Sequence, residues 1–141
     1  MPPHPEGVVY RRRIDLDRLI LVDTSVWIGF YRGSHDAVGV AGLLEENLVL
    51  MHPWIAGELA LENLGPQRAP MLKDLQLLPA ADVIPDREVL DFIESRRLYN
   101  RGIGWVDAQL LGSALLSGAR FWTFDGPATR AARELGIPVV P

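Results

Sequence analysis

Short, mainly apolar runs alternate with stretches of helical periodicity along most of this chain. The clearest runs occupy positions 19–22, 48–51 and 121–124, and each is too short to form a stable helix. Consecutive apolar positions are typical of strands that are buried on both faces in a parallel sheet. Weaker runs predict two further strands, at 78–84 and 137–140.

The segments between these runs carry apolar residues three and four positions apart, which is the spacing of one helix face. Pro53 and Pro85 can each open a helix, because the first helical position does not need an N–H group. Helices are predicted from about 26 to 33 and over 36–46, 53–63, 67–77, 85–98, 105–117 and 127–135. Strands that alternate with helices predict an α/β fold, a three-layer α/β/α domain with a central parallel sheet of four to five strands.

The chain has 141 residues, which suits one compact domain. Residues 1–18 begin with three prolines and a histidine and continue with three arginines, Arg11, Arg12 and Arg13. This composition indicates a flexible N-terminal tail or a start assigned too far upstream, with a basic RNA-contacting arm as the alternative. We therefore expect the folded domain to span 19–141.

The composition of the chain excludes several kinds of site and of protein. The absence of cysteine excludes disulfides and thiolate metal sites, and no apolar run is long enough for a signal peptide or a membrane span. These features fit a cytoplasmic protein. The net charge of −4 argues against a nucleic-acid-binding protein, unless carboxylates in its site hold cations.

Four acidic residues lie at positions where a carboxylate is expected either to bind a ligand or to need a partner. Asp23 and Asp125 follow two predicted strands, and the carboxyl ends of parallel strands form the ligand-binding edge of an open α/β sheet. Glu58 and Asp107 are flanked by apolar residues at helical spacing, with no Lys or Arg within four positions. Burying a carboxylate without a partner destabilises the folded state by roughly several kcal/mol, so a buried carboxylate is expected to have a partner.

A hard divalent cation is the simplest common partner, because Mg²⁺ prefers carboxylate and water oxygens. One or two Mg²⁺ ions, or Mn²⁺ in their place, could hydrolyse a phosphodiester. Ser25 and Thr123 are positioned to orient a ligand or a bound water. Each acid also has a structural interpretation, as a helix cap, a residue at a helix N-terminus, a turn residue or a half-exposed helix residue.

Other polar and aromatic residues support several interpretations. Three arginines precede the helix that carries Asp107, and they fit either a solvated helix end or a contact with an RNA backbone: Arg96, Arg97 and Arg101. His35 and His52 lack metal-ligand spacing, which favours structural or surface roles. The four tryptophans lie within apolar runs and are expected in the core rather than as platforms for stacking bases.

At these residues the sequence resembles the PIN domain and, within it, the VapC-type toxins. The matching blocks lie in the same order, at 21–28, 57–59, 104–111 and 123–125. One departure is that Gly126 and Pro127 follow Asp125, where similar proteins often carry another polar or acidic residue; this puts a second metal ion in doubt.

The resemblance implies a Mg²⁺-dependent endoribonuclease that cleaves structured RNA. Asp23 and Asp107 would be its first-choice metal ligands, and Glu58 and Asp125 would complete the cluster. The resemblance also implies a homodimer and a small cognate antitoxin that neutralises the toxin.

Two other classes compete with this interpretation. A PIN-like fold could bind RNA or protein without cutting, although retention of all four acids argues against that. Haloacid-dehalogenase-like phosphatases also place an aspartate after the first strand. They need a second aspartate where Ser25 stands and a lysine late in the chain, whereas Lys73 is the sole lysine here.

Overall fold

The centre of the domain is a small parallel sheet. The computed structural model describes residues 19–140, and its strands are β1 (Ile20–Val22), β2 (Val49–Leu50) and β3 (Arg120–Trp122). They are ordered β2-β1-β3, and both pairings are parallel. At most 1% of each β1 residue is exposed, so this strand is covered on both faces, as its continuous apolar run predicts.

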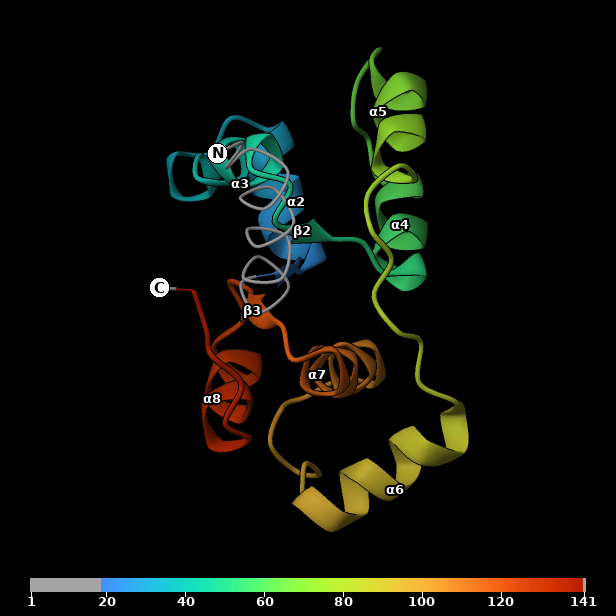
Figure 1. Ribbon diagram of the computed structural model, residues 1–141, viewed down its shortest axis with the longest axis vertical. Coiled ribbons are helices and arrows are strands. Elements are labelled where there is room, and N and C mark those ends of the chain that lie inside the picture. Colours follow the sequence, from blue (N-terminus) through green and yellow to red (C-terminus); the bar gives the residue numbers. More distant parts are fainter. Residues whose placement is uncertain (1–18, 141) are drawn as a thin grey trace, which may run out of the picture.

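Helices cover both faces of the sheet (Figure 1). In chain order they are α2 (Thr24–Tyr31), the 3-10 turn η1 (His35–Ala37), α3 (Val40–Glu45), α4 (Pro53–Ala60), α5 (Arg68–Leu75), α6 (Asp86–Arg96), α7 (Trp105–Ser117) and α8 (Gly126–Glu134). Figure 1 shows α2 and α3 on one side of the strands, α7 and α8 on the other, and α6 outside α7. This arrangement confirms the three-layer α/β/α prediction.

The prediction of four to five strands is wrong for the described part of the chain, which contains three. The segments predicted at 78–84 and 137–140 each form one parallel bridge, Met51 with Ala80 and Phe121 with Val139. To extend either bridge toward its N-terminal side, the preceding residue would have to donate its N–H to the neighbouring strand. Those residues are Pro79 and Pro138, which have no N–H, so neither pairing can extend in that direction.

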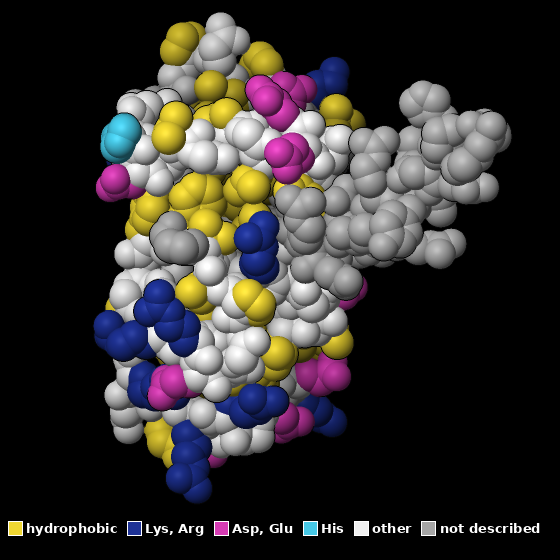
Figure 2. All heavy atoms as spheres, turned by 60° about the vertical axis from the view of Figure 1, so that its left-hand side comes forward, with side chains coloured by type: hydrophobic (Ala, Val, Ile, Leu, Met, Phe, Trp, Pro, Cys, Tyr) yellow, Lys and Arg dark blue, Asp and Glu magenta, His cyan; other side chains and the backbone are white. Residues whose placement is uncertain are grey.

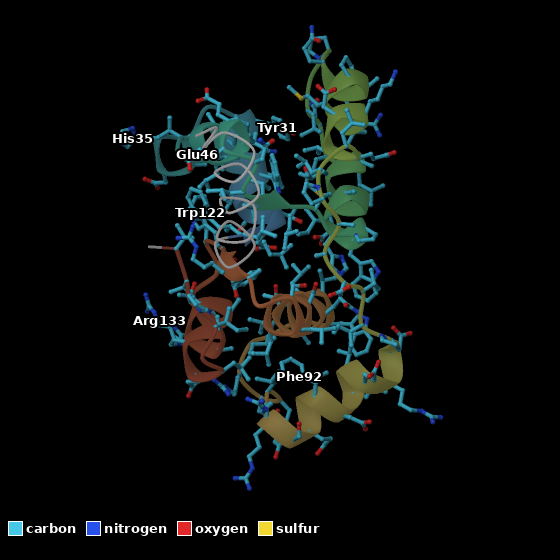
Figure 3. The ribbon with its side chains drawn as sticks, viewed as in Figure 1. Tyr31, His35, Glu46, Phe92, Trp122 and Arg133 are labelled. Atoms are coloured by element: carbon cyan, nitrogen blue, oxygen red, sulfur yellow. The ribbon has the colours of Figure 1, made fainter. Side chains whose placement is uncertain are left out.

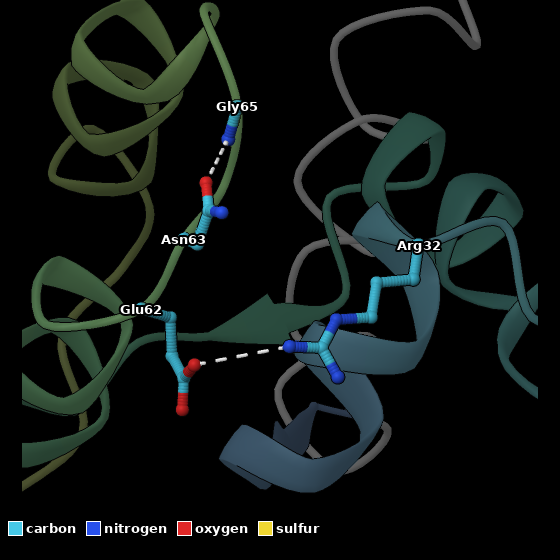
Figure 4. A network of polar contacts seen from close by, with 4 residues as sticks. All are labelled: Arg32, Glu62, Asn63 and Gly65. Carbon is cyan, nitrogen blue, oxygen red and sulfur yellow. Dashed lines mark hydrogen bonds and ion pairs between the residues drawn. The ribbon is translucent and has the colours of Figure 1, made fainter.

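Most predicted helices form, with shorter ends. The helix predicted over 36–46 is divided into η1 and α3, and glycines at 39 and 42 lower the helical propensity of that segment. The predicted tail at 1–18 lies outside the described residues. An ion pair of 3.9 Å between Arg32 and Glu62 links the end of α2 to the segment after α4 (Figure 4).

Aromatic and polar contacts fix α7 against its neighbours. Phe92 projects from α6 toward α7 (Figure 3), where a Cβ on Gly112 would lie 3.6 Å from its ring. Gln109 on α7 is fully buried; its amide donates to the Ile84 carbonyl (2.9 Å), and its Oε1 accepts from the Ile84 N–H (2.8 Å). The Gln109 side chain therefore makes the two hydrogen bonds to Ile84, in the connection before α6, that a neighbouring strand would otherwise make.

His52 joins this network and has the structural role predicted for it. Its Nδ1 accepts from the Trp54 N–H at 3.0 Å, which caps α4, so we assign the ring proton to Nε2, 3.4 Å from Gln109 Oε1. Burial lowers the pKa of His52, which keeps the ring neutral.

We predict that Gln109→Leu lowers the free energy of unfolding by about 2 kcal/mol or more, because the Ile84 amide and carbonyl lose their partner. Urea unfolding measures this change. Leu116→Gln is the matched control: Leu116 lies on the same helix with 66% of its surface exposed, so the change should stay within about 0.5 kcal/mol. Equal effects of the two substitutions would contradict the role assigned to Gln109.

Candidate functional site

Asp23 follows β1 directly and is the most buried of the four predicted acids, with 7% of its surface exposed. Its backbone N–H donates to the Trp122 carbonyl at 2.8 Å, which places it beside the end of β3. Its Oδ2 accepts from Thr123 Oγ1 (2.7 Å) and from Ser25 Oγ (3.0 Å). Although Asp23 occupies the N-cap position of α2, its side chain makes no capping bond, so helix capping does not explain the residue.

The two hydroxyls that orient Asp23 also join the ends of β1 and β3. Ser25 Oγ accepts from the Phe124 N–H at 3.1 Å, and Thr123 Oγ1 accepts from the Asp125 N–H at 3.1 Å. Each hydroxyl thus accepts from the segment after β3 and donates to the Asp23 carboxylate. Within the described residues, the Asp23 carboxylate is therefore the group that both hydroxyls orient.

Glu58 lies half-buried on α4 and is held by a residue that sequence reasoning missed. Thr24, the first residue of α2, donates its Oγ1 to Glu58 Oε1 at 2.6 Å. This bond ties the start of α2 to the helix that carries Glu58. The only signal in the sequence was a hydroxyl next to Asp23, which is also the signature of an ordinary helix start.

Asp107 lies in the first turn of α7, where its Oδ2 accepts from the Gly104 N–H at 3.2 Å. Burial raises the pKa of Asp107 above its usual range, and the Gly104 hydrogen bond opposes that shift. The negative charges of Asp23, Asp125 and Glu58 raise the pKa further. All three acids therefore lie close enough to act on Asp107, so the chain folds the four carboxylates toward one region.

Asp125 caps α8, since its Oδ2 accepts from the Ala128 N–H at 2.9 Å. Asp125 is therefore a helix cap rather than the turn residue that the Asp-Gly dipeptide suggested, whereas Asp107 has the position at a helix N-terminus that the sequence left open. Each occupies one carboxylate oxygen, Oδ2, and leaves Oδ1 without a hydrogen-bond partner among residues 19–140.

No Lys, Arg or His within the described residues pairs with any of the four acids. The ion pairs seen there join Arg32 to Glu62 and Arg101 to Glu134. Between positions 19 and 140, no three His, Cys, Asp or Glu side chains form a closed metal-ligand group. The cluster is therefore a concentration of uncompensated negative charge rather than a ready-made cage.

The chemistry of these side chains fits a hard divalent cation. Mg²⁺ usually keeps several of its waters and binds through one or two carboxylates, so it does not require a closed group of three. Asp23 supplies a buried carboxylate whose Oδ1 has no hydrogen-bond partner in the described part of the chain. Asp107 supplies a second carboxylate, destabilised in its ionised form by like charges that a cation would neutralise.

The three arginines predicted to contact RNA have different surroundings. Arg96 and Arg97 are exposed at the end of α6, and Arg97 has a left-handed backbone with φ of 54°. Arg101 pairs with Glu134 of α8. It also lines a hollow of about 580 Å³, whose other lining residues are Pro127, Arg130, Arg133 and Glu134.

The hollow lies along α8, where Arg133 projects outward in Figure 3. Lys and Arg side chains are concentrated in the lower half of the face shown in Figure 2. None of the described helices combines the length and apolar character needed to cross a bilayer.

Comparison with known proteins identifies the family of this chain. The PIN domain family model matches residues 20–134. The chain is also 44% identical over 120 residues to Ribonuclease VapC32 from two strains of Mycobacterium tuberculosis, an alignment that covers 84% of this chain and 94% of each relative. The chain therefore belongs to the PIN-domain family and, within it, to the VapC-type proteins.

Proposed function

We propose that this protein is a metal-dependent endoribonuclease, the toxin of a toxin–antitoxin pair. The proposal rests on one main observation. The charges of Asp23, Glu58 and Asp125 raise the pKa of Asp107 in addition to the effect of burial, and no cationic side chain among the described residues pairs with these acids. The relatives at 44% identity are named ribonucleases, which supports the same activity for this chain.

In this proposal Asp23 and Asp107 hold Mg²⁺ or Mn²⁺, and Glu58 and Asp125 border the ion. The bound cation would neutralise charge on the phosphodiester and promote attack by water. Ser25 and Thr123 fix Asp23 through Oδ2, which leaves Oδ1 for the cation. Thr24 occupies Glu58 Oε1, so Oε2 is the atom left to accept a proton during hydrolysis.

The substrate is proposed to be structured RNA, with phosphate contacts from the arginine hollow along α8. Arg101, Arg130 and Arg133 line that hollow, and guanidinium groups suit bidentate phosphate binding. Arg96 and Arg97 remain candidates on the neighbouring helix end. A small cognate antitoxin, a homodimeric assembly and a cytoplasmic location complete the proposal.

The phosphatase alternative has no support in the structure. Ser25 occupies the position of the second aspartate that such enzymes need and is bonded to Asp23. Lys73 is exposed on α5, away from a strand end. A non-catalytic binding module would not require four converging carboxylates.

We predict that Asp23→Asn and Asp107→Asn each reduce Mg²⁺-dependent RNA cleavage by about 100-fold or more, because each removes a charge that holds the cation. Gel assays on total RNA with Mg²⁺, Mn²⁺ or EDTA measure the loss. Asp91→Asn, an exposed acid on α6, is the control and should cleave normally. Cleavage that persists in excess EDTA would overturn the proposal.

We also predict that Asp107→Asn melts about 3 °C higher than the wild-type protein at neutral pH in EDTA. Because the folded-state pKa of Asp107 is raised, the folded protein loses stability as the pH rises through that pKa. The substitution removes this penalty, so the difference should shrink as the pH falls from above the folded-state pKa of Asp107 toward the ordinary carboxyl pKa.

Saturating Mg²⁺ tests the same electrostatic penalty by neutralising the charge instead of removing it. It should raise the melting temperature of the wild-type protein more than that of the variant, because only the intact cluster binds the ion tightly. A variant that is less stable than wild type in EDTA, or that gains equally from Mg²⁺, would contradict this electrostatic account.

A further inference from the structure

Exposed aromatic side chains occur in the α6–α7 connection and next to two of the four acids in the sequence. Among the described residues the exposed aromatic side chains are Tyr99, Trp105 and Phe124. Trp105 lies two residues before Asp107, and Phe124 lies directly before Asp125. The expectation that every tryptophan belongs to the core is wrong for Trp105, which is 41% exposed. Exposed aromatic surface beside a polar site is a sign of ligand contact.

Trp105 forms part of a pocket of about 320 Å³ between the α6–α7 connection and the start of α7. This volume is at the small end of the range for ligand pockets, about 300–1,000 Å³. The lining is mostly apolar and includes two exposed aromatic rings; the residues are Ile93, Leu98, Tyr99, Asn100, Ile103, Gly104, Trp105 and Ala108.

Asn100 is the amide in this lining. Its backbone is left-handed, with φ of 59°, a conformation that asparagine tolerates better than most residues. Its side chain has no hydrogen-bond partner in the part of the chain that the structure describes. A free amide offers both a donor and an acceptor to a bound ligand.

The pocket adjoins the carboxylates through shared residues. Gly104 lines the pocket and donates its N–H to Asp107. The Trp105 ring lies 6.4 Å from that of Trp54, which precedes Glu58 by one turn of α4. The two indoles therefore bridge the helices that carry Glu58 and Asp107. A group in this pocket would be attached close to a phosphate at the cluster.

We propose that this pocket binds an unpaired nucleobase of the RNA, next to the phosphodiester that is cut. Trp105 and Tyr99 provide rings for stacking, and Asn100 provides the hydrogen bonds to the edge of the base. The inference rests on the proposed nuclease function and specifies its substrate. A base inside a duplex presents no free face, so the nucleotide must lie in a loop, a bulge or a single strand.

The test measures binding separately from cleavage. Fluorescently labelled single-stranded RNA hexamers, each of one base, and a labelled RNA duplex are titrated with full-length protein in Ca²⁺, which can occupy a carboxylate site in place of Mg²⁺, and anisotropy is recorded. The wild-type protein should bind hexamers more tightly than the duplex. Trp105→Ala should weaken hexamer binding about tenfold and leave duplex binding unchanged, since stacking on the ring is lost.

Three further variants keep the result interpretable. Trp105→Phe retains a ring and should restore most of the affinity. Leu116→Ala, an exposed residue near the other end of α7, should bind as wild type does. Asn100→Gly keeps the left-handed backbone and should change the order of preference among the four bases.

Three results would overturn the inference: Trp105→Ala binds hexamers as tightly as the wild type, the substitution weakens the binding of hexamers and duplex equally, or the wild-type protein shows no preference for hexamers. Cleavage assays run in parallel separate this outcome from failure of the nuclease proposal. Normal cleavage with unchanged binding by Trp105→Ala would refute the pocket alone. Preferential hexamer binding that depends on Trp105, in a protein that never cleaves RNA, would refute the nuclease alone.

Discussion

The hydroxyl of Thr123 donates to Asp23 across the end of the sheet, at 2.7 Å between residues that are 100 positions apart. This bond requires β1 and β3 to be neighbours in parallel register, because only then do both strands end at the same edge. It also orients a nearly buried carboxylate without neutralising it. A lysine or arginine in place of the hydroxyl would neutralise the charge that a cation needs.

The other acids add to this unbalanced charge. Each sits at the start of an element or on a helix face directed toward Asp23: Glu58 on α4, Asp107 in the first turn of α7 and Asp125 at the start of α8. Their charges act on Asp107, which disfavours the folded state and would favour any state that binds a cation. In the proposed function, local stability is lost in exchange for cation binding, as is common where function needs a strained or charged site. In the proposed function, the same bound cation would allow a chain of net charge −4 to bind a polyanion.

Much of this architecture follows from local pattern. The bounds of α7 are those that its periodicity predicts, and Asp107 stood out because its apolar neighbours left no nearby cation to pair with it. The number of strands did not follow, because a single proline such as Pro79 can stop a strand pairing from extending in one direction. Thr24 and Gln109 could not be recognised from the sequence, since their partners lie 34 and 25 positions away. Trp105 was misjudged because an apolar run does not show which of its faces remains exposed.

The central claim is that the four carboxylates act together as one cation site, and paramagnetic broadening in NMR spectra tests it most directly. When Mn²⁺ is titrated into isotopically labelled protein, we expect the backbone amide signals around Asp23, Glu58, Asp107 and Asp125 to broaden first. Signals from α5 should stay sharp, and EDTA should restore the spectrum. Broadening centred elsewhere, for example on Asp86 and Glu88 at the start of α6, or spread evenly over the surface, would contradict the account.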